Sequence, residues 1–235
     1  MKVVILAGGF GTRLAEYTDT IPKPMVQIGN IPILIHIMKI YSHFGFKEFC
    51  ILLGYKGEII KDYFSSEKFP DWSINLIETG ENTMTGGRLL EAKEFIKKET
   101  FFLTYGDGLG NIDISSLLNF HIKKKKIMTV TAVRPTARFG ELELENDNVT
   151  SFDEKPQMQK GWINGGFFVV NPIFIDYIKD ETIMLEREPM KKITEEQQLV
   201  AFKHHGYWQC MDTKREYDLL NSMWDEGKPR WLMEK

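Results

Sequence analysis

The sequence predicts a doubly wound α/β fold, in which a mostly parallel sheet carries a small β-hairpin insertion. Strand-like and helix-like runs alternate through the first half of the 235 residues, and this βαβα order produces a parallel sheet with helices on both faces. The strand-like runs are apolar throughout, as expected for strands that are covered on both faces. Residues 140–156 instead alternate with a period of two around Asn146, Asp147 and Asn148, which is typical of a hairpin. We therefore expect a Rossmann-like arrangement.

The first predicted strand, Val3–Ala7, leads into a glycine-rich turn. The helix that follows spans residues 32–45, because apolar residues recur at helical spacing, Pro32 suits the first turn and Gly45 ends the pattern. Further strands are predicted at 48–55, 73–78, 100–108, 127–133 and 163–172, and further helices at 57–64, 86–98 and 213–227. Ligands bind beyond the C-terminal ends of such strands, so the glycine turn, the stretch TYGDG and the loop after Glu78 should meet at one cleft.

The composition excludes several other classes of protein. A hydrophobic fraction of 43% and a charged fraction of 27% are ordinary for a folded protein, and the length suits one domain over residues 1–235. The net charge of −3 offers no basic surface for nucleic acid. No apolar stretch reaches the ~20 residues of a membrane span, and Cys50 and Cys210 have neither metal nor disulfide spacing. We expect a cytoplasmic protein with no nucleic-acid or membrane partner.

The stretch VVILAGGFGTRL, Val3 to Leu14, has the composition of a phosphate-binding turn. Its three glycines let the backbone bend tightly and bring N–H groups close to an anion. It is not the dinucleotide fingerprint G-x-G-x-x-G, because Leu14 stands at the third glycine. It is not a P-loop either, because Thr12 and Arg13 follow Gly11 where a Lys and then a Ser or Thr would be needed. A glycine-rich turn without a ligand remains the alternative.

Charged residues that could act on a phosphate follow along the chain. Lys23 lies between Pro22 and Pro24, whose fixed backbone angles restrict it, and its ammonium is a strong point charge for phosphate. Asp107 lies between two glycines, either as a carboxylate at the ligand edge of the sheet or as an ordinary turn residue. Asp212 is either its partner or the N-cap of the last helix. Two carboxylates beside a polyphosphate would suit Mg²⁺.

Seven stretches in a fixed order carry a resemblance to a known family: LAGGFGTRL, KPM, TGGRL, YGDG, FDEKP, INGGFFVVNP and YWQCMDT. Together they resemble the sugar-phosphate nucleotidyltransferases, and within them the cytidylyltransferases that act on glucose 1-phosphate. The resemblance implies a fold of the nucleotide-diphospho-sugar transferase type, a homo-oligomer and a place in nucleotide-sugar biosynthesis for surface polysaccharide. The implied reaction joins CTP and a phosphorylated small molecule, glucose 1-phosphate first, into a CDP-linked product and pyrophosphate.

The resemblance also implies roles for individual residues. Arg13, Lys23 and Asp107 would be catalytic, and Asp107 and Asp212 would bind Mg²⁺. The phosphorylated acceptor would contact Glu154, Lys155, Asn164 and Gly165. The nucleotide would contact Leu6, Ala7, Gly8, Gly9, Gly11, Thr12, Arg13, Thr79, Gly80, Thr85, Gly86 and Arg88.

Three alternatives stay open. The acceptor could be another sugar phosphate or a non-sugar phosphate, because segment Ser65–Ser73 is shorter than the insertion typical of the glucose-specific cytidylyltransferases. The chain could be a regulatory subunit that has kept the fold and lost the chemistry, although Arg13, Lys23 and Asp107 are all present. A nicotinamide-dependent dehydrogenase is disfavoured by Leu14.

Overall fold

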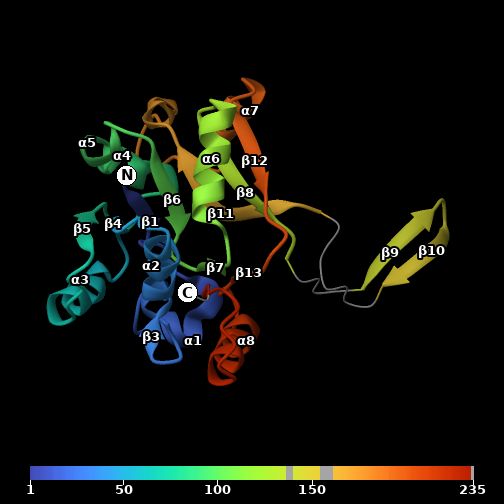
Figure 1. Cartoon of the computed structure of the whole chain (residues 1–235), viewed down its shortest axis with the longest axis horizontal. Helices are drawn as coiled ribbons and strands as arrows, with labels where there is room; N and C mark the ends of the chain where they lie inside the picture. The colour runs from blue at the N-terminus through green and yellow to red at the C-terminus, as the bar shows by residue number, and fades with distance from the viewer. Residues whose placement is uncertain (136–139, 154–160, 234–235) are drawn as a thin grey trace.

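The computed structural model describes residues 1–135, 140–153 and 161–233. The strands of the central sheet are β1 (Val3–Leu6), β4 (Glu48–Leu53), β5 (Ser73–Glu78), β6 (Phe101–Tyr105), β8 (Met128–Val133), β11 (Ile163–Val170) and β12 (Leu199–Lys203). They lie in the order β12-β8-β11-β6-β1-β4-β5 (Figure 1). Parallel pairing joins β1 to β4 and β6, β4 to β5, and β8 to β12. Only β11 runs antiparallel to its neighbours in this sheet, so the predicted mostly parallel α/β sheet is confirmed.

The remaining described strands form three antiparallel pairs: β2 (Gln27–Ile28) with β3 (Ile31–Pro32), β7 (Gly108–Gly110) with β13 (Trp208–Cys210), and β9 (Glu141–Glu145) with β10 (Asn148–Asp153). The β9–β10 pair confirms the predicted hairpin. The α-helices are α1 (Ala15–Thr18), α2 (Ile33–His43), α3 (Gly57–Ser66), α4 (Thr85–Glu91), α5 (Lys93–Ile96), α6 (Ile114–Lys124), α7 (Glu188–Glu195) and α8 (Lys214–Asp225). The 3₁₀ helices are η1 (Thr12–Leu14), η2 (Lys23–Met25) and η3 (Pro172–Tyr177).

Side chains on alternate positions of the central strands build two separate cores. Val3 and Ile5 belong to one buried cluster, which also contains side chains of α2, α6 and α8. Val4 and Leu6 belong to the other, which contains side chains of α4, α5 and α7. Because successive strand residues point to opposite faces, helices cover both sides of the sheet, and this explains why the strand sequences are apolar throughout.

One predicted helix is interrupted. The pattern over 86–98 predicts a single helix, whereas the structure has α4 and α5 with a break at Ala92, whose ψ of 1° lies outside the α-helical range. The sequence has no glycine or proline there that would indicate the break. None of the helices within the three described ranges is long and apolar enough to cross a membrane.

His36 of α2 ties the end of the chain to the first core. Its Nδ1 accepts a hydrogen bond from the Trp231 indole N–H at 3.1 Å, and its Nε2 donates to the carbonyl oxygen of Ile28 at 3.1 Å. Both rings are fully buried, and they meet edge to face. Burial lowers the pKa of His36 to about 4. The imidazole is therefore neutral, and a proton on Nδ1 would face the indole N–H and break the link.

Acid should weaken the fold through this histidine. The unfolded chain takes up a proton on His36 near pH 6.5 and the folded chain only near pH 4, so the free energy of unfolding should fall as the pH drops through that window. Between pH 7 and pH 5 we expect His36 to account for a loss of about 2 kcal/mol. Urea unfolding at pH 7 and pH 5 measures the free energy of unfolding of both proteins. The decrease between the two pH values should be smaller in His36→Gln than in the wild type by this amount. Equal losses in the two proteins would contradict the assignment.

Candidate active site

The glycine-rich turn after β1 is held from behind by neighbouring loops. The carbonyl oxygen of Gly8 accepts hydrogen bonds from the Tyr55 N–H at 3.2 Å and from the Arg88 guanidinium at 2.8 Å. Gly11 has a φ of +65°, which favours glycine, and its carbonyl oxygen accepts a hydrogen bond from the Thr18 hydroxyl at 3.1 Å. The outer edge of the turn is exposed, so its shape is fixed while its surface stays accessible.

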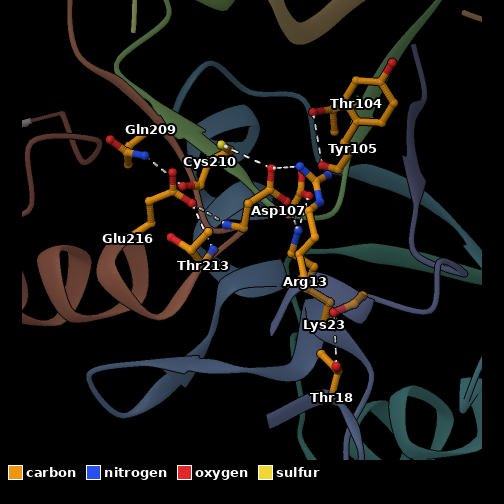
Figure 2. A network of polar contacts seen from close by, with 12 residues as sticks. Arg13, Thr18, Lys23, Thr104, Tyr105, Asp107, Gln209, Cys210, Thr213 and Glu216 are labelled. Atoms are coloured by element: carbon orange, nitrogen blue, oxygen red, sulfur yellow. Dashed lines mark hydrogen bonds and ion pairs between the residues drawn. The ribbon is translucent and has the colours of Figure 1, made fainter. Parts of the chain in front are cut away.

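Lys23 joins two carboxylates close to this turn (Figure 2). Its Nζ lies 2.6 Å from Asp107 Oδ2 and 2.5 Å from Asp212 Oδ1. Arg13 Nη1 lies 2.8 Å from the other oxygen of Asp212, Oδ2. The side chain of Lys23 is 11% exposed and that of Arg13 is 73% exposed. The four residues form a chain of ion pairs, Asp107–Lys23–Asp212–Arg13, in which Lys23 is the most buried member and Arg13 is the exposed end.

Hydrogen bonds between backbone groups bring the two aspartates side by side. Asp107 lies between β6 and β7, and Asp212 follows β13. The antiparallel pairing of β7 with β13 sets Gly108 opposite Cys210, and the Met211 N–H donates to the carbonyl oxygen of Asp107 at 2.9 Å. Asp212 is therefore the partner of Asp107. The sequence interpretation of Asp107 as a carboxylate at the edge of the sheet required such a partner.

The N-cap of α8 is Thr213 and not Asp212. Thr213 and Glu216 form a capping box, and Glu216 Oε2 accepts hydrogen bonds from the N–H groups of Asp212 at 2.7 Å and Thr213 at 2.9 Å. The alternative in which Asp212 caps the helix is therefore wrong. Its carboxylate faces Lys23 and Arg13 instead.

The charges of this cluster follow from its partners. Burial acts to lower the pKa of Lys23, but Asp107 and Asp212 outweigh it and hold that pKa above its ordinary value. Burial acts to raise the pKa of Asp212, but Lys23 and Arg13 outweigh it and hold that pKa below its ordinary value. Burial and the nearby carboxylates raise the pKa of Cys210 to about 12. Lys23 and Asp212 are therefore charged at neutral pH, whereas Cys210 is a thiol and a poor nucleophile.

Two pockets meet at the ion-pair chain. The smaller, of about 390 Å³, is lined by the glycine turn and residues 81–85. The larger, of about 770 Å³, is lined in part by residues 163–166 of β11. Arg13, Tyr105 and Asp107 line both. A ligand in one pocket and a ligand in the other would therefore come together at these three side chains.

Most of the predicted nucleotide contacts lie around the smaller pocket. The predicted residues that line it are Leu6, Ala7, Gly8, Gly9, Gly11, Thr12, Arg13, Thr85 and Arg88. Arg88 is 4% exposed, and its guanidinium donates to the carbonyl oxygens of Gly8, Leu53 and Gly80 at 2.8 to 2.9 Å. It thereby fixes the glycine turn and the loops after β4 and β5 in one arrangement.

Three residues predicted to contact the nucleotide, Thr79, Gly80 and Gly86, are not among those that line this pocket. The Thr79 hydroxyl is buried and donates to the carbonyl oxygen of Leu53 at 2.6 Å. Gly86 packs against the loop before α7, where a Cβ would lie 2.6 Å from the carbonyl oxygen of Ile183. The missing side chain lets the start of α4 approach that loop closely. Thr79 and Gly86 therefore hold the surrounding loops together.

Several lining residues were not predicted. In the smaller pocket these include Glu81, Asn82, Thr83 and Met84, and in the larger pocket they include Tyr105, Trp208 and Gln209. The stretch TGENTMTGGRL contains the first four, but a loop has no periodicity that would show which residues face a ligand. Among the predicted acceptor contacts, Asn164 and Gly165 line the larger pocket, whereas Glu154 and Lys155 lie outside the described residues.

The two aspartates suit a divalent cation in their chemistry and spacing. Their oxygens contact one nitrogen atom at 2.6 and 2.5 Å, so they are close enough to share one ion, and Mg²⁺ prefers carboxylate and phosphate oxygens. Within the part of the chain that the structure describes, no group of three or more His, Cys, Asp or Glu side chains could hold a metal ion alone. Further ligands would have to come from substrate phosphates or water.

The comparison with protein families identifies the class of this protein. The nucleotidyl transferase family model matches residues 2–225. The chain therefore belongs to the nucleotidyl transferase family.

Individual relatives narrow the comparison. The chain is 44% identical to the glucose-1-phosphate cytidylyltransferase of Salmonella typhi, over 98% of both chains. It is 43% identical to the probable glucose-1-phosphate cytidylyltransferase of Bacillus subtilis (strain 168), over 98% of this chain and 99% of that one. The crystal structure of HddC from Yersinia pseudotuberculosis matches with a TM-score of 0.77 and 25% identity, over 95% of this chain and 99% of that chain.

Removal of the shared ammonium should expose the repulsion between the two aspartates. We expect Lys23→Met to lower the Tm, because two carboxylates then face each other at close range, and we expect millimolar Mg²⁺ to raise the Tm of the variant more than that of the wild type. Lys179→Met is the matched control, since Lys179 forms an exposed ion pair with Glu188 at 2.6 Å. A response of Lys23→Met to Mg²⁺ no larger than that of the control would contradict this description.

Proposed function

We propose that this chain is a glucose-1-phosphate cytidylyltransferase, a single nucleotidyltransferase domain that converts CTP and glucose 1-phosphate into CDP-glucose and pyrophosphate. The observation that carries the proposal is the 44% identity to the Salmonella typhi enzyme over 98% of both chains. The geometry supports it, because two pockets meet at a cluster of cations and carboxylates, as a transfer between two phosphorylated substrates requires.

The proposed reaction needs charge neutralisation and alignment. A phosphate oxygen of glucose 1-phosphate attacks the α-phosphorus of CTP, a new P–O bond forms, and the bond to pyrophosphate breaks. The attacking phosphate has a second pKa of ~6, so it is largely ionised at neutral pH and needs no general base. Alignment of two bound substrates can supply roughly 7–11 kcal/mol of the barrier. The reaction therefore uses Lys, Arg and Asp side chains, and the protonated Cys210 takes no part in it.

The ion-pair chain provides cations for the triphosphate and carboxylates for a metal ion. Arg13, Lys23 and the N–H groups of the glycine turn neutralise the triphosphate in the smaller pocket. Asp107 and Asp212 would hold Mg²⁺, which would screen the phosphate charges. Lys23 exchanges its carboxylate partners for phosphate oxygens as the nucleotide enters. These roles agree with the position of Arg13 and Asp107 in the walls of both pockets.

The acceptor occupies the larger pocket beside Asn164 and Gly165. The alignment with the Salmonella typhi enzyme extends over 253 positions, more than the 235 residues of this chain, so that relative carries residues that this chain lacks. Segment 65–73 joins α3 to β5, and none of its residues, all of which the structure describes, lines either pocket. The residues present in this segment therefore give no reason to prefer another acceptor.

The cellular context is part of the same proposal. The product serves nucleotide-sugar biosynthesis for a surface polysaccharide, and the chain works as a homo-oligomer in the cytoplasm. The free thiols of Cys50 and Cys210 agree with a reducing compartment. No observation favours the alternative of a regulatory subunit that has lost the chemistry, because Arg13, Lys23 and Asp107 are present and lie together.

The choice of nucleotide tests the first half of the proposal. We expect kcat/KM for CTP to exceed that for UTP and dTTP by tenfold or more, because an acceptor group placed for the cytosine amino group is left unpaired against uracil, at a cost of ~1–3 kcal/mol. Pyrophosphate release with CTP, UTP, dTTP, ATP and GTP measures this preference. Equal use of UTP or dTTP would overturn the cytidine assignment.

The choice of acceptor tests the second half. The enzyme should convert glucose 1-phosphate into CDP-glucose. It should use this acceptor faster than galactose 1-phosphate, mannose 1-phosphate or a phosphorylated alcohol such as glycerol 3-phosphate. Product identification by mass spectrometry separates the outcomes. An enzyme that turns over CTP with another acceptor and forms no CDP-glucose would contradict the glucose assignment and leave the nucleotide assignment standing.

A further inference from the structure

Glu186 links the walls of the two pockets and has no place in the proposed reaction. It lies in the loop between η3 and α7, and its carboxylate accepts two hydrogen bonds. The Tyr105 hydroxyl donates to Oε1 at 2.7 Å and the Thr85 hydroxyl donates to Oε2 at 2.6 Å. Hydrogen bonds to a charged acceptor are about twice as strong as those between neutral groups.

Each of these hydroxyl groups also accepts a hydrogen bond. Asn164 Nδ2 donates to the Tyr105 hydroxyl at 3.2 Å, and the Leu185 N–H donates to the Thr85 hydroxyl at 3.1 Å. Two chains of hydrogen bonds therefore end on the Glu186 carboxylate. One runs from Asn164 through the Tyr105 hydroxyl, and the other runs from the Leu185 N–H through the Thr85 hydroxyl. Burial and the negative charge of Glu186 raise the pKa of Tyr105 above its ordinary value, so this hydroxyl keeps its proton.

The ring of Tyr105 has little freedom. It lies at the end of β6, two residues before Asp107, and packs edge to face against Phe168 with 5.8 Å between ring centroids. Gly166 lies against the ring, and a Cβ there would be 2.6 Å from Tyr105 Cδ2. Packing therefore limits the movement of the ring, and the hydrogen bond to Glu186 fixes the position of its hydroxyl.

We propose that Glu186 is a positioning residue, which holds Tyr105 at the junction of the two pockets and ties it to Thr85 at the start of α4. Tyr105 and Thr85 line the smaller pocket, and Tyr105 and Asn164 line the larger one. Glu186 itself is not among the described residues that line either pocket, so it acts through these partners. The inference rests on the proposed function, because it assigns the two pockets to two substrates that must be aligned.

The expected effect is on alignment rather than on charge. A displacement of about 1 Å at a reacting centre can lower a rate by as much as 100-fold. We expect Glu186→Gln and Tyr105→Phe each to lower kcat/KM for the acceptor at least tenfold, and the double variant to be no worse than the poorer single variant, because both changes break one connection. Glu188→Gln is the matched control, since Glu188 is exposed and pairs with Lys179 on the surface.

Two measurements decide the proposal. The first is a double-mutant cycle of Tyr105→Phe and Glu186→Gln in urea unfolding, where we expect coupling of at least threefold in the unfolding equilibrium constant; additive effects would overturn the proposal whatever the activity. The second is steady-state kinetics with CTP and the acceptor that the wild type uses. Kinetic constants of Glu186→Gln equal to those of Glu188→Gln would mark a purely structural contact and would also overturn it. A wild type that is inactive with every nucleotide and acceptor would instead refute the proposed function.

Discussion

The candidate active site depends on the ammonium of Lys23, which holds two carboxylates together in a partly buried place. Asp107 and Asp212 would repel each other at this distance, and the loss of water around them would increase the repulsion. Lys23 contacts both, and Arg13 adds a second cation from the solvent side. The prolines on either side of Lys23 restrict its backbone, so the ammonium is held where the carboxylates need it. The two cations thereby keep the two carboxylates from facing each other unpaired.

The glycine turn depends on a second buried cation in the same way. Arg88 donates hydrogen bonds to backbone carbonyl oxygens from the turn and from the loops after β4 and β5. Its desolvation lowers its pKa from the ordinary value, and these hydrogen bonds offset the cost of burying the charge. One side chain thus sets the relative position of three loops at the edge of the sheet. The open face of the turn can then be exposed without losing its shape.

The sequence predicts what depends on local pattern. The apolar strands, the helix that became α2 and the β9–β10 hairpin follow from periodicity and turn composition, and the glycine turn, Lys23 and Asp107 follow from residue types in a recognisable order. The break at Ala92 is not predictable in this way, because alanine is a good helix former and nothing beside it ends a helix. Tyr105 and Glu186 are also beyond local pattern, since their contact joins residues 81 positions apart in the chain. The sequence likewise left two interpretations of Asp212, as the partner of Asp107 or as the N-cap of the last helix. The capping box at Thr213 rules out the second.

The short pairing of β7 with β13 joins two segments that are far apart in the chain. A backbone hydrogen bond between Met211 and Asp107 fixes the spacing of the two carboxylates at their own position. The stretch between β7 and β13 includes the β9–β10 hairpin and β11, which lines the larger pocket and pairs with β6. A longer loop within that stretch should leave the spacing of the two carboxylates unchanged, provided that β7 and β13 remain paired. Tolerance to insertion and constancy of the aspartate pair are therefore compatible in this fold.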